Sequence, residues 1–142
     1  MPISRSKLIN KGFTILELLI VVVILSILAA YVGPKYFKGL EKSKVGTAKS
    51  QMQSIAKALD LYRLDVGQYP TTSQGLIGLV QNPQEEKWKG PYLEKDLPMD
   101  PWGNQYRYAQ PSLKNTSNEF DLYSYGGDGK EGGDKDNADI WY

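Results

Sequence analysis

The feature that most constrains this chain is an almost entirely apolar stretch of 20 residues at positions 13–32. As an α-helix, a segment of that length spans about 30 Å, the hydrocarbon thickness of a bilayer. One acidic residue, Glu17, lies inside it, where an unpartnered carboxylate costs on the order of 3 kcal/mol. The sequence therefore predicts a membrane anchor carrying an acid that anchoring alone does not explain.

Basic residues flank this stretch on its N-terminal side. Arg5, Lys7 and Lys11 precede it, and no acid accompanies them. By the positive-inside rule, the N-terminus is expected in the cytoplasm and the rest of the chain across the membrane. Two simpler interpretations stay open: a removable secretory signal that ends in the small residues at positions 29–30, and an ordinary transmembrane anchor. Neither of them accounts for Glu17.

Composition limits the chemistry of the remaining chain. The 142 residues leave room for one small domain after the anchor. Without positions 1–12 the chain has 14 basic and 16 acidic residues, so no basic surface argues for a nucleic-acid partner. Cys and His are both absent, which removes disulfides, thiol and imidazole catalysis and the usual zinc ligands. No nucleophile and base are paired by spacing, so we expect a protein that is not an enzyme.

A second helical pattern follows the apolar stretch. Gly33-Pro34 predicts a kink or local unwinding, because proline lacks an N–H and its ring clashes with the preceding turn. Beyond it, apolar residues recur at alternating spacings of three and four up to a stop at Gly67. We interpret this stripe as the core face of a soluble domain rather than as a free coiled coil. Its members are Val45, Ala48, Met52, Ile55, Leu59, Tyr62 and Val66.

The C-terminal half predicts a small antiparallel sheet. Residues 105–109 and 120–125 alternate apolar and polar side chains, which is typical of two strands joined by the polar segment 110–119. A short helix is expected at 75–80, and a proline turn at 100–104 allows its Trp to fold over the core. Two strands need the long helix to cover one face. The predicted fold class is therefore α+β, with an irregular tail.

The tail from position 126 onward combines glycines with acidic side chains. Clustered carboxylates on a flexible backbone suit calcium, which accepts six to eight oxygen ligands in irregular geometry. A solvated acidic tail is the open alternative, although the apolar end at 140–142 favours an ordered segment. The match of residues 127–132 to a dinucleotide-binding pattern is rejected, because no apolar helix follows it. The acids concerned are Asp128, Glu131, Asp134, Asp136 and Asp139.

Several segments resemble a known family. Residues 11–17, Lys-Gly-Phe-Thr-Ile-Leu-Glu, with the apolar stretch and Pro34 after them, resemble the class III signal of type IV pilins and pseudopilins. Residues 69–76, 100–103 and 124–129 resemble the G-type major pseudopilins of type II secretion systems. The implied fold is type IV pilin-like: a long N-terminal helix, half transmembrane and half amphipathic, on a small antiparallel sheet with an irregular C-terminal calcium loop.

The resemblance implies a processing site and a domain plan. A prepilin peptidase would cut between Gly12 and Phe13 and methylate the new amine of Phe13. Residues 1–12 would be a cleaved cytoplasmic leader, 13–33 a transmembrane helix that becomes the filament core, and 34–142 a periplasmic globular domain. The implied location is the bacterial inner membrane, with the C-terminal domain in the periplasm, and a periplasmic filament after assembly.

The resemblance also implies a function and partners. The expected function is that of the major structural subunit of the pseudopilus, a homopolymer whose growth drives exoprotein export through the outer membrane. Expected partners are minor pseudopilins, the prepilin peptidase, an inner-membrane assembly platform with its ATPase, and an outer-membrane secretin. Glu17 is expected to pair with the N-terminal amine of an incoming subunit, because a buried ion pair costs less than a single buried charge.

Other functions remain as alternatives. A type IV pilin or a minor pseudopilin would serve adhesion, motility or DNA uptake, and the missing Cys pair and the acidic tail argue against it. A single-span periplasmic binding protein would keep Met1.

Finally, the resemblance implies calcium in the C-terminal loop, in place of a disulfide. The ligands would be Asp128 and Asp139 with carbonyls near Tyr125 and Lys130, and the shell would be completed by one or more of Asp134, Asp136 and Asn137.

Overall fold

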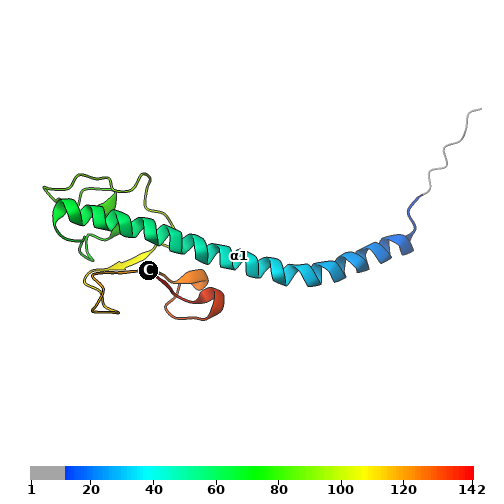
Figure 1. Ribbon diagram of the computed structural model, residues 1–142. Helices are drawn as coiled ribbons and strands as arrows, with labels where there is room; N and C mark the ends of the chain where they lie inside the picture. The colour runs from blue at the N-terminus through cyan, green and yellow to red at the C-terminus, as the bar shows by residue number, and fades with distance from the viewer. Residues whose placement is uncertain (1–11) are drawn as a thin grey trace, which may run out of the picture. The chain divides into compact units, whose positions relative to one another are not determined.

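The computed structural model describes residues 12–142, apart from the side chain of Asp136. The leader predicted at residues 1–12 lies outside this part except for Gly12, its last residue. One long helix, α1 (Ile15–Val66), is followed by short elements that end in a sheet (Figure 1). The chain divides into two compact units along α1, the first ending at Gly39 and the second being Leu40–Tyr142. Each unit is described by itself.

The helix in the first unit is apolar and has no protein core around it. Its most apolar 18-residue window has a mean hydropathy of 2.9, and none of that window is buried. Length and composition therefore allow α1 to cross a membrane. The helix also runs through Pro34 without interruption, so the predicted local unwinding is absent. Proline removes one hydrogen bond of the ladder, but the neighbouring bonds continue the helix on both sides.

The predicted stripe is the core face of α1 in the second unit. Five of its members are buried, and Val45 and Val66 pack against the core from its edges. The helix ends where the sequence indicates: Gly67 adopts φ +98°, and its N–H donates to the Arg63 carbonyl at 2.8 Å. The prediction of a helix buried on one side is confirmed. The five buried members are Ala48, Met52, Ile55, Leu59 and Tyr62.

Loops complete the core around this stripe. The short helix expected at 75–80 is the 3₁₀-helix η1 (Leu76–Leu79). The ring of Tyr92 packs edge to face on Tyr62 at 5.6 Å and on Trp88 at 5.7 Å. Trp102 packs against the same core, as predicted, and its indole N–H donates to Glu41 Oε2 at 3.1 Å. The irregular segment between η1 and the sheet thus contributes aromatic side chains to the core.

The sheet has three antiparallel strands in the order β1 (Arg107–Ala109), β2 (Asp121–Ser124) and β3 (Ile140–Trp141). Tyr108 pairs with Leu122, and Tyr123 pairs with Trp141. The first two strands are those predicted, but the chain end forms a third strand instead of an irregular tail. Pairing with β3 gives the central strand β2 a second neighbour, and the buried Ile140 adds an apolar side chain to the core.

Candidate assembly site and metal-binding loop

The predicted processing site lies just before α1. Gly12 and Phe13 are outside the helix, and the Phe13 side chain is 82% exposed. An exposed, non-helical peptide bond is the form that a peptidase can bind and cut. The first helical residue, Ile15, follows two positions after Phe13.

Glu17 closes a reciprocal cap at the start of α1. The Thr14 backbone N–H donates to Glu17 Oε2 at 3.0 Å, and the Thr14 hydroxyl donates to the same oxygen at 3.1 Å. In return, the Glu17 backbone N–H donates to Thr14 Oγ1 at 3.2 Å. This is the capping box, in which two otherwise unpaired backbone donors are satisfied. This cap was not predicted, although Thr-x-x-Glu before an apolar run is its signature.

The capping bonds do not neutralise the charge of Glu17. None of the salt bridges found among residues 12–142 includes this carboxylate. Its neighbours on α1 are apolar and exposed, with Leu16 at 65% and Leu18 at 59%. The first turn of α1 thus presents an anion, held in place by Thr14, on an otherwise apolar surface. Such an anion is suited to bind a cation from another molecule.

The predicted metal loop connects β2 to β3 and is built from two short helices. They are η2 (Gly126–Asp128) and η3 (Lys135–Asn137). Gly126 has φ +70°, and a Cβ at this position would lie 2.7 Å from the Ala138 carbonyl oxygen. Only glycine fits this close approach of the two limbs of the loop. The limbs are therefore brought together by the backbone, with the acidic side chains around them.

Among the described residues of the loop, one carboxylate has a buried oxygen without a hydrogen-bond donor. Asp139 Oδ2 accepts from the Gly132 N–H at 3.0 Å, while its Oδ1 is buried and has no partner in the structure. Asp128 Oδ1 accepts from the Lys130 N–H at 3.1 Å, and Asp128 is exposed. A buried carboxylate oxygen without a donor is costly, and a bound cation would satisfy it.

The other predicted ligands occupy varied positions. Tyr125 precedes η2, and Arg107 lies over its ring at 5.4 Å. Asp134 and Asn137 are both exposed; Asp134 precedes η3 and Asn137 is its last residue, whose N–H donates to the Asp134 carbonyl at 3.0 Å. The side chain of Asp136 is outside the described part. Within residues 12–142, no three acidic side chains converge on one point, so a cation here would also need backbone carbonyls or water.

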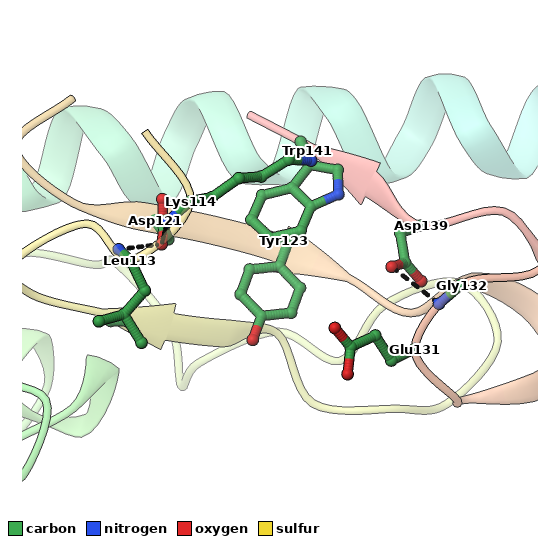
Figure 2. A pocket seen from close by; sticks show the side chains of 9 residues that line it. Leu113, Lys114, Asp121, Tyr123, Glu131, Gly132, Asp139 and Trp141 are labelled. Atoms are coloured by element: carbon green, nitrogen blue, oxygen red, sulfur yellow. Dashed lines mark hydrogen bonds between the residues drawn. The ribbon is translucent and has the colours of Figure 1, made fainter. Parts of the chain in front are cut away.

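A cavity of about 490 Å³ opens beside Asp139. Figure 2 shows the Asp139 and Glu131 carboxylates near one another on one side, and the stacked rings of Tyr123 and Trp141 beside them. Those rings are 4.2 Å apart, and Lys114 Nζ lies 3.5 Å from the Trp141 ring. Glu131, an acid of the tail outside the predicted ligand set, also lines this cavity.

Asp100, a buried acid outside the predicted metal loop, helps to position that loop, although the sequence indicates only that Asp100 belongs to a turn. Asp100, 4% exposed, accepts from the backbone N–H groups of Trp102 and Asn104 at 3.1 and 2.7 Å. Its other oxygen accepts from the Ser124 hydroxyl at 2.5 Å, and Ser124 Oγ accepts from the Gly126 N–H at 3.1 Å. The turn at 100–104 is thus connected to the start of the predicted metal loop.

The class of this protein follows from its similarity to known proteins. The N-terminal region matches the prokaryotic N-terminal methylation motif over residues 8–33. The structure is similar to the crystal structure of the major pseudopilin from the type 2 secretion system of enterohaemorrhagic Escherichia coli. That similarity has a TM-score of 0.59 and 31% identity, covering 72% of this chain and 89% of that chain. Fold and N-terminal site together define a type IV pilin-like protein.

The family follows from the rest of the chain. Residues 35–142 match the family model for type II secretion system protein G. The chain is 52% identical over 136 residues to the type II secretion system core protein G of Pseudomonas aeruginosa, covering 92% of this chain and 93% of that protein. It is 44% identical over 135 residues to the core protein G of Vibrio cholerae, with 92% and 90% covered. The chain belongs to the type II secretion system protein G family.

Proposed function

We propose that this chain is the major structural subunit of a type II secretion pseudopilus, stored in the inner membrane and polymerised into a periplasmic filament. The observation that carries the proposal is the first turn of α1, where an anion held by Thr14 lies on an apolar helix that no protein core covers. Exposed apolar surface of this extent needs lipid or other copies of the chain around it. Storage in a membrane would supply the lipid, and packing in a filament would supply the other copies.

Assembly would use Glu17 as the contact that sets the register. Removal of residues 1–12 would leave a positive amine on Phe13, at the depth of the Glu17 carboxylate in a neighbouring subunit. An ion pair between them offsets the cost of keeping either charge in an apolar surrounding. The capping bonds from Thr14 would hold the carboxylate ready for that amine.

The partners follow from this role. A prepilin peptidase would process the Gly12–Phe13 bond on the cytoplasmic side, and an inner-membrane platform with its ATPase would drive polymerisation. Minor pseudopilins would join the same filament, and an outer-membrane secretin would receive the exported proteins. The chain itself would catalyse no reaction; its work would be polymerisation.

Calcium would complete the C-terminal loop of the subunit. The fit rests on the buried Asp139 Oδ1 that has no donor, and on the oxygen-rich chemistry of its neighbours. Asp139 and Asp128 would bind the ion with the carbonyls of Tyr125 and Lys130. One or more of Asp134, Asp136 and Asn137 would complete the shell. The ion would tie the β2–β3 connection together in a chain that has no disulfide.

The function is tested in two measurements on cells that carry the secretion system. Mass spectrometry of the membrane-extracted chain should find residues 1–12 missing and one methyl group added. Glu17→Ala subunits should be inserted and cleaved as usual but give few filaments, while Ser26→Ala, which removes a polar group from the same helix, should assemble normally. A retained leader, or a normal filament yield from Glu17→Ala, would contradict the proposal.

A further inference from the structure

The apolar part of α1 is followed by a short segment rich in aromatic and basic side chains. Tyr31, Lys35, Tyr36, Phe37 and Lys38 lie within eight consecutive positions, all in the first unit and all exposed. The exposed fractions of the three aromatic side chains are 69%, 67% and 66% in chain order. A cluster of this size without a protein partner indicates contact with something outside the subunit.

The helix arranges these side chains in a specific way. Lys35 and Lys38 follow Tyr31 by four and seven positions, so the three share one face of α1. Lys35 Nζ lies 5.2 Å from the centre of the Tyr31 ring, within the range of a cation–π contact. Tyr36 and Phe37 pack edge to face at 6.1 Å. One face is therefore cationic, and aromatic rings extend around it.

The positive charge of this face is not balanced by acidic side chains of the subunit. No Asp or Glu occurs between Glu17 and Glu41. Glu41 accepts from Lys44 Nζ at 3.0 Å and from the Trp102 indole at 3.1 Å. None of the salt bridges found among residues 12–142 includes Lys35 or Lys38. The two ammonium groups are available to an external anion.

We propose that the segment 31–38 binds the headgroups of anionic phospholipids at the membrane surface on the side of the C-terminal domain. This proposal rests on the membrane-stored subunit described under the proposed function. Tyr rings suit the depth of the headgroups, and lysines extend from an apolar helix toward the phosphates. Each lysine near an anionic surface contributes roughly a fivefold gain in binding.

The location of this segment gives the binding a role in assembly. Leader removal would eliminate Arg5, Lys7 and Lys11, the basic residues on the other side of the apolar stretch. The side-chain cations nearest to the membrane would then be Lys35 and Lys38. Headgroups hold the processed subunit at the C-terminal end of its apolar stretch. Incorporation of the subunit into the filament must release those headgroups.

The experiment compares lipid retention in the purified full chain by native mass spectrometry after release from detergent micelles. Equal amounts of phosphatidylglycerol and phosphatidylcholine are added to wild type, to the double variant Lys35→Gln/Lys38→Gln and to Lys57→Gln/Lys87→Gln. The last is a matched control, since it removes two exposed lysines of the second unit. Circular dichroism of each variant should show unchanged helix content.

Wild type and control should retain phosphatidylglycerol in preference to phosphatidylcholine. In the Lys35→Gln/Lys38→Gln variant, the ratio of retained phosphatidylglycerol to phosphatidylcholine should be lower by a factor of about five or more. An unchanged preference would overturn the proposal. So would displacement of phosphatidylglycerol by inorganic phosphate at equal concentration, because a general anion site would then be present. An unchanged preference with reduced filament yield would assign the segment to contacts between copies. Lipid binding is measured on isolated subunits, so its failure is separate from a failure of the filament test.

Discussion

The carboxylate of Glu17 accepts the backbone N–H of Thr14 at 3.0 Å, and Thr14 Oγ1 accepts the backbone N–H of Glu17 at 3.2 Å. Glu17 therefore has two roles that a single Ala substitution would remove together: a helix cap and a negative charge. Glu17→Gln separates them, because Gln also closes a capping box but carries no charge.

The cap predicts a difference between two Thr14 variants. Thr14→Ala should weaken the first turn of α1 by about 1 kcal/mol, while Thr14→Ser keeps the hydroxyl and should behave as wild type. Hydrogen exchange of the first-turn amides in detergent measures the difference. In the filament assay, Glu17→Gln should fail as Glu17→Ala does, and an assembly-competent Glu17→Gln would attribute the role to the cap instead of the charge.

Asp100 is expected to be the acid whose loss most destabilises the second unit. Asp100→Ala would leave the partly buried N–H groups of Trp102 and Asn104 and the buried Ser124 hydroxyl without their acceptor, and a buried group without its partner costs about 1 to 3 kcal/mol. The melting temperature, followed by tryptophan fluorescence, should fall by roughly 10 °C or more. The exposed Asp96→Ala serves as control and should change it little. Equal melting temperatures for the two variants would refute this role.

Bound calcium should increase the stability of the folded chain. Chelation should lower the melting temperature of the wild type or increase its sensitivity to protease, since the ion stabilises only the folded loop. Asp139→Asn should lower the melting temperature without chelator and remove the effect of chelation. Glu131→Gln, a neighbouring carboxylate outside the proposed ligand set, should keep it. If chelation changes neither property of the wild type, the metal site does not exist.

Two buried tyrosines should respond oppositely to loss of their hydroxyl. Tyr62 is fully buried, its hydroxyl has no hydrogen-bond partner within the described residues 12–142, and burial raises the pKa of Tyr62 to about 12. Tyr62→Phe should leave the free energy of unfolding unchanged or raise it, because an unsatisfied buried hydroxyl is removed. Tyr106→Phe should lower it by about 1 kcal/mol, since the Tyr106 hydroxyl bonds to Gln51 at 2.6 Å. Chemical denaturation of both variants gives the comparison.

The Asp121 carboxylate should make the stability of the folded chain sensitive to acid. Burial raises the pKa of this carboxyl, but hydrogen bonds from the Ser112 hydroxyl and the Leu113 and Lys114 backbone N–H groups outweigh it, and the net pKa is lowered. A lowered pKa in the folded state means that its stabilising contribution is present above about pH 4 and is lost as pH falls below that value. Unfolding measured between pH 6 and pH 3 should show this loss in wild type, and Asp121→Asn should have a smaller pH dependence. An equal slope for both would exclude Asp121 as the source.

Several parts of the fold follow from local patterns. The spacing of Met52, Ile55 and Leu59 predicts the buried face of α1, because a helix repeats every 3.6 residues whatever lies opposite it. Gly67 predicts the end of the helix for a similarly local reason, its access to positive φ. The cap formed by Thr14 and Glu17 depends on an equally local pattern, Thr-x-x-Glu, although the prediction for Glu17 concerned only its charge.

Other parts depend on residues far apart in the chain. Ile140 appears in the sequence as an apolar end, and it becomes strand β3 only because β2 offers it an unpaired edge. Asp100 appears as a turn residue until Ser124, 24 positions later, donates to it. The unpartnered oxygen of Asp139 likewise depends on which donors the folded loop brings near it.

The sequence by itself determined the membrane-length helix, its acid at position 17, its buried stripe and its family, since each depends on neighbours within one segment or on a linear pattern. The tertiary structure alone decided the three-stranded sheet, the Asp100 network at the start of the β2–β3 loop, and the buried oxygen that a cation would satisfy. The physical reason is that hydrogen bonding and burial between distant segments are fixed only when the backbone has brought those segments together.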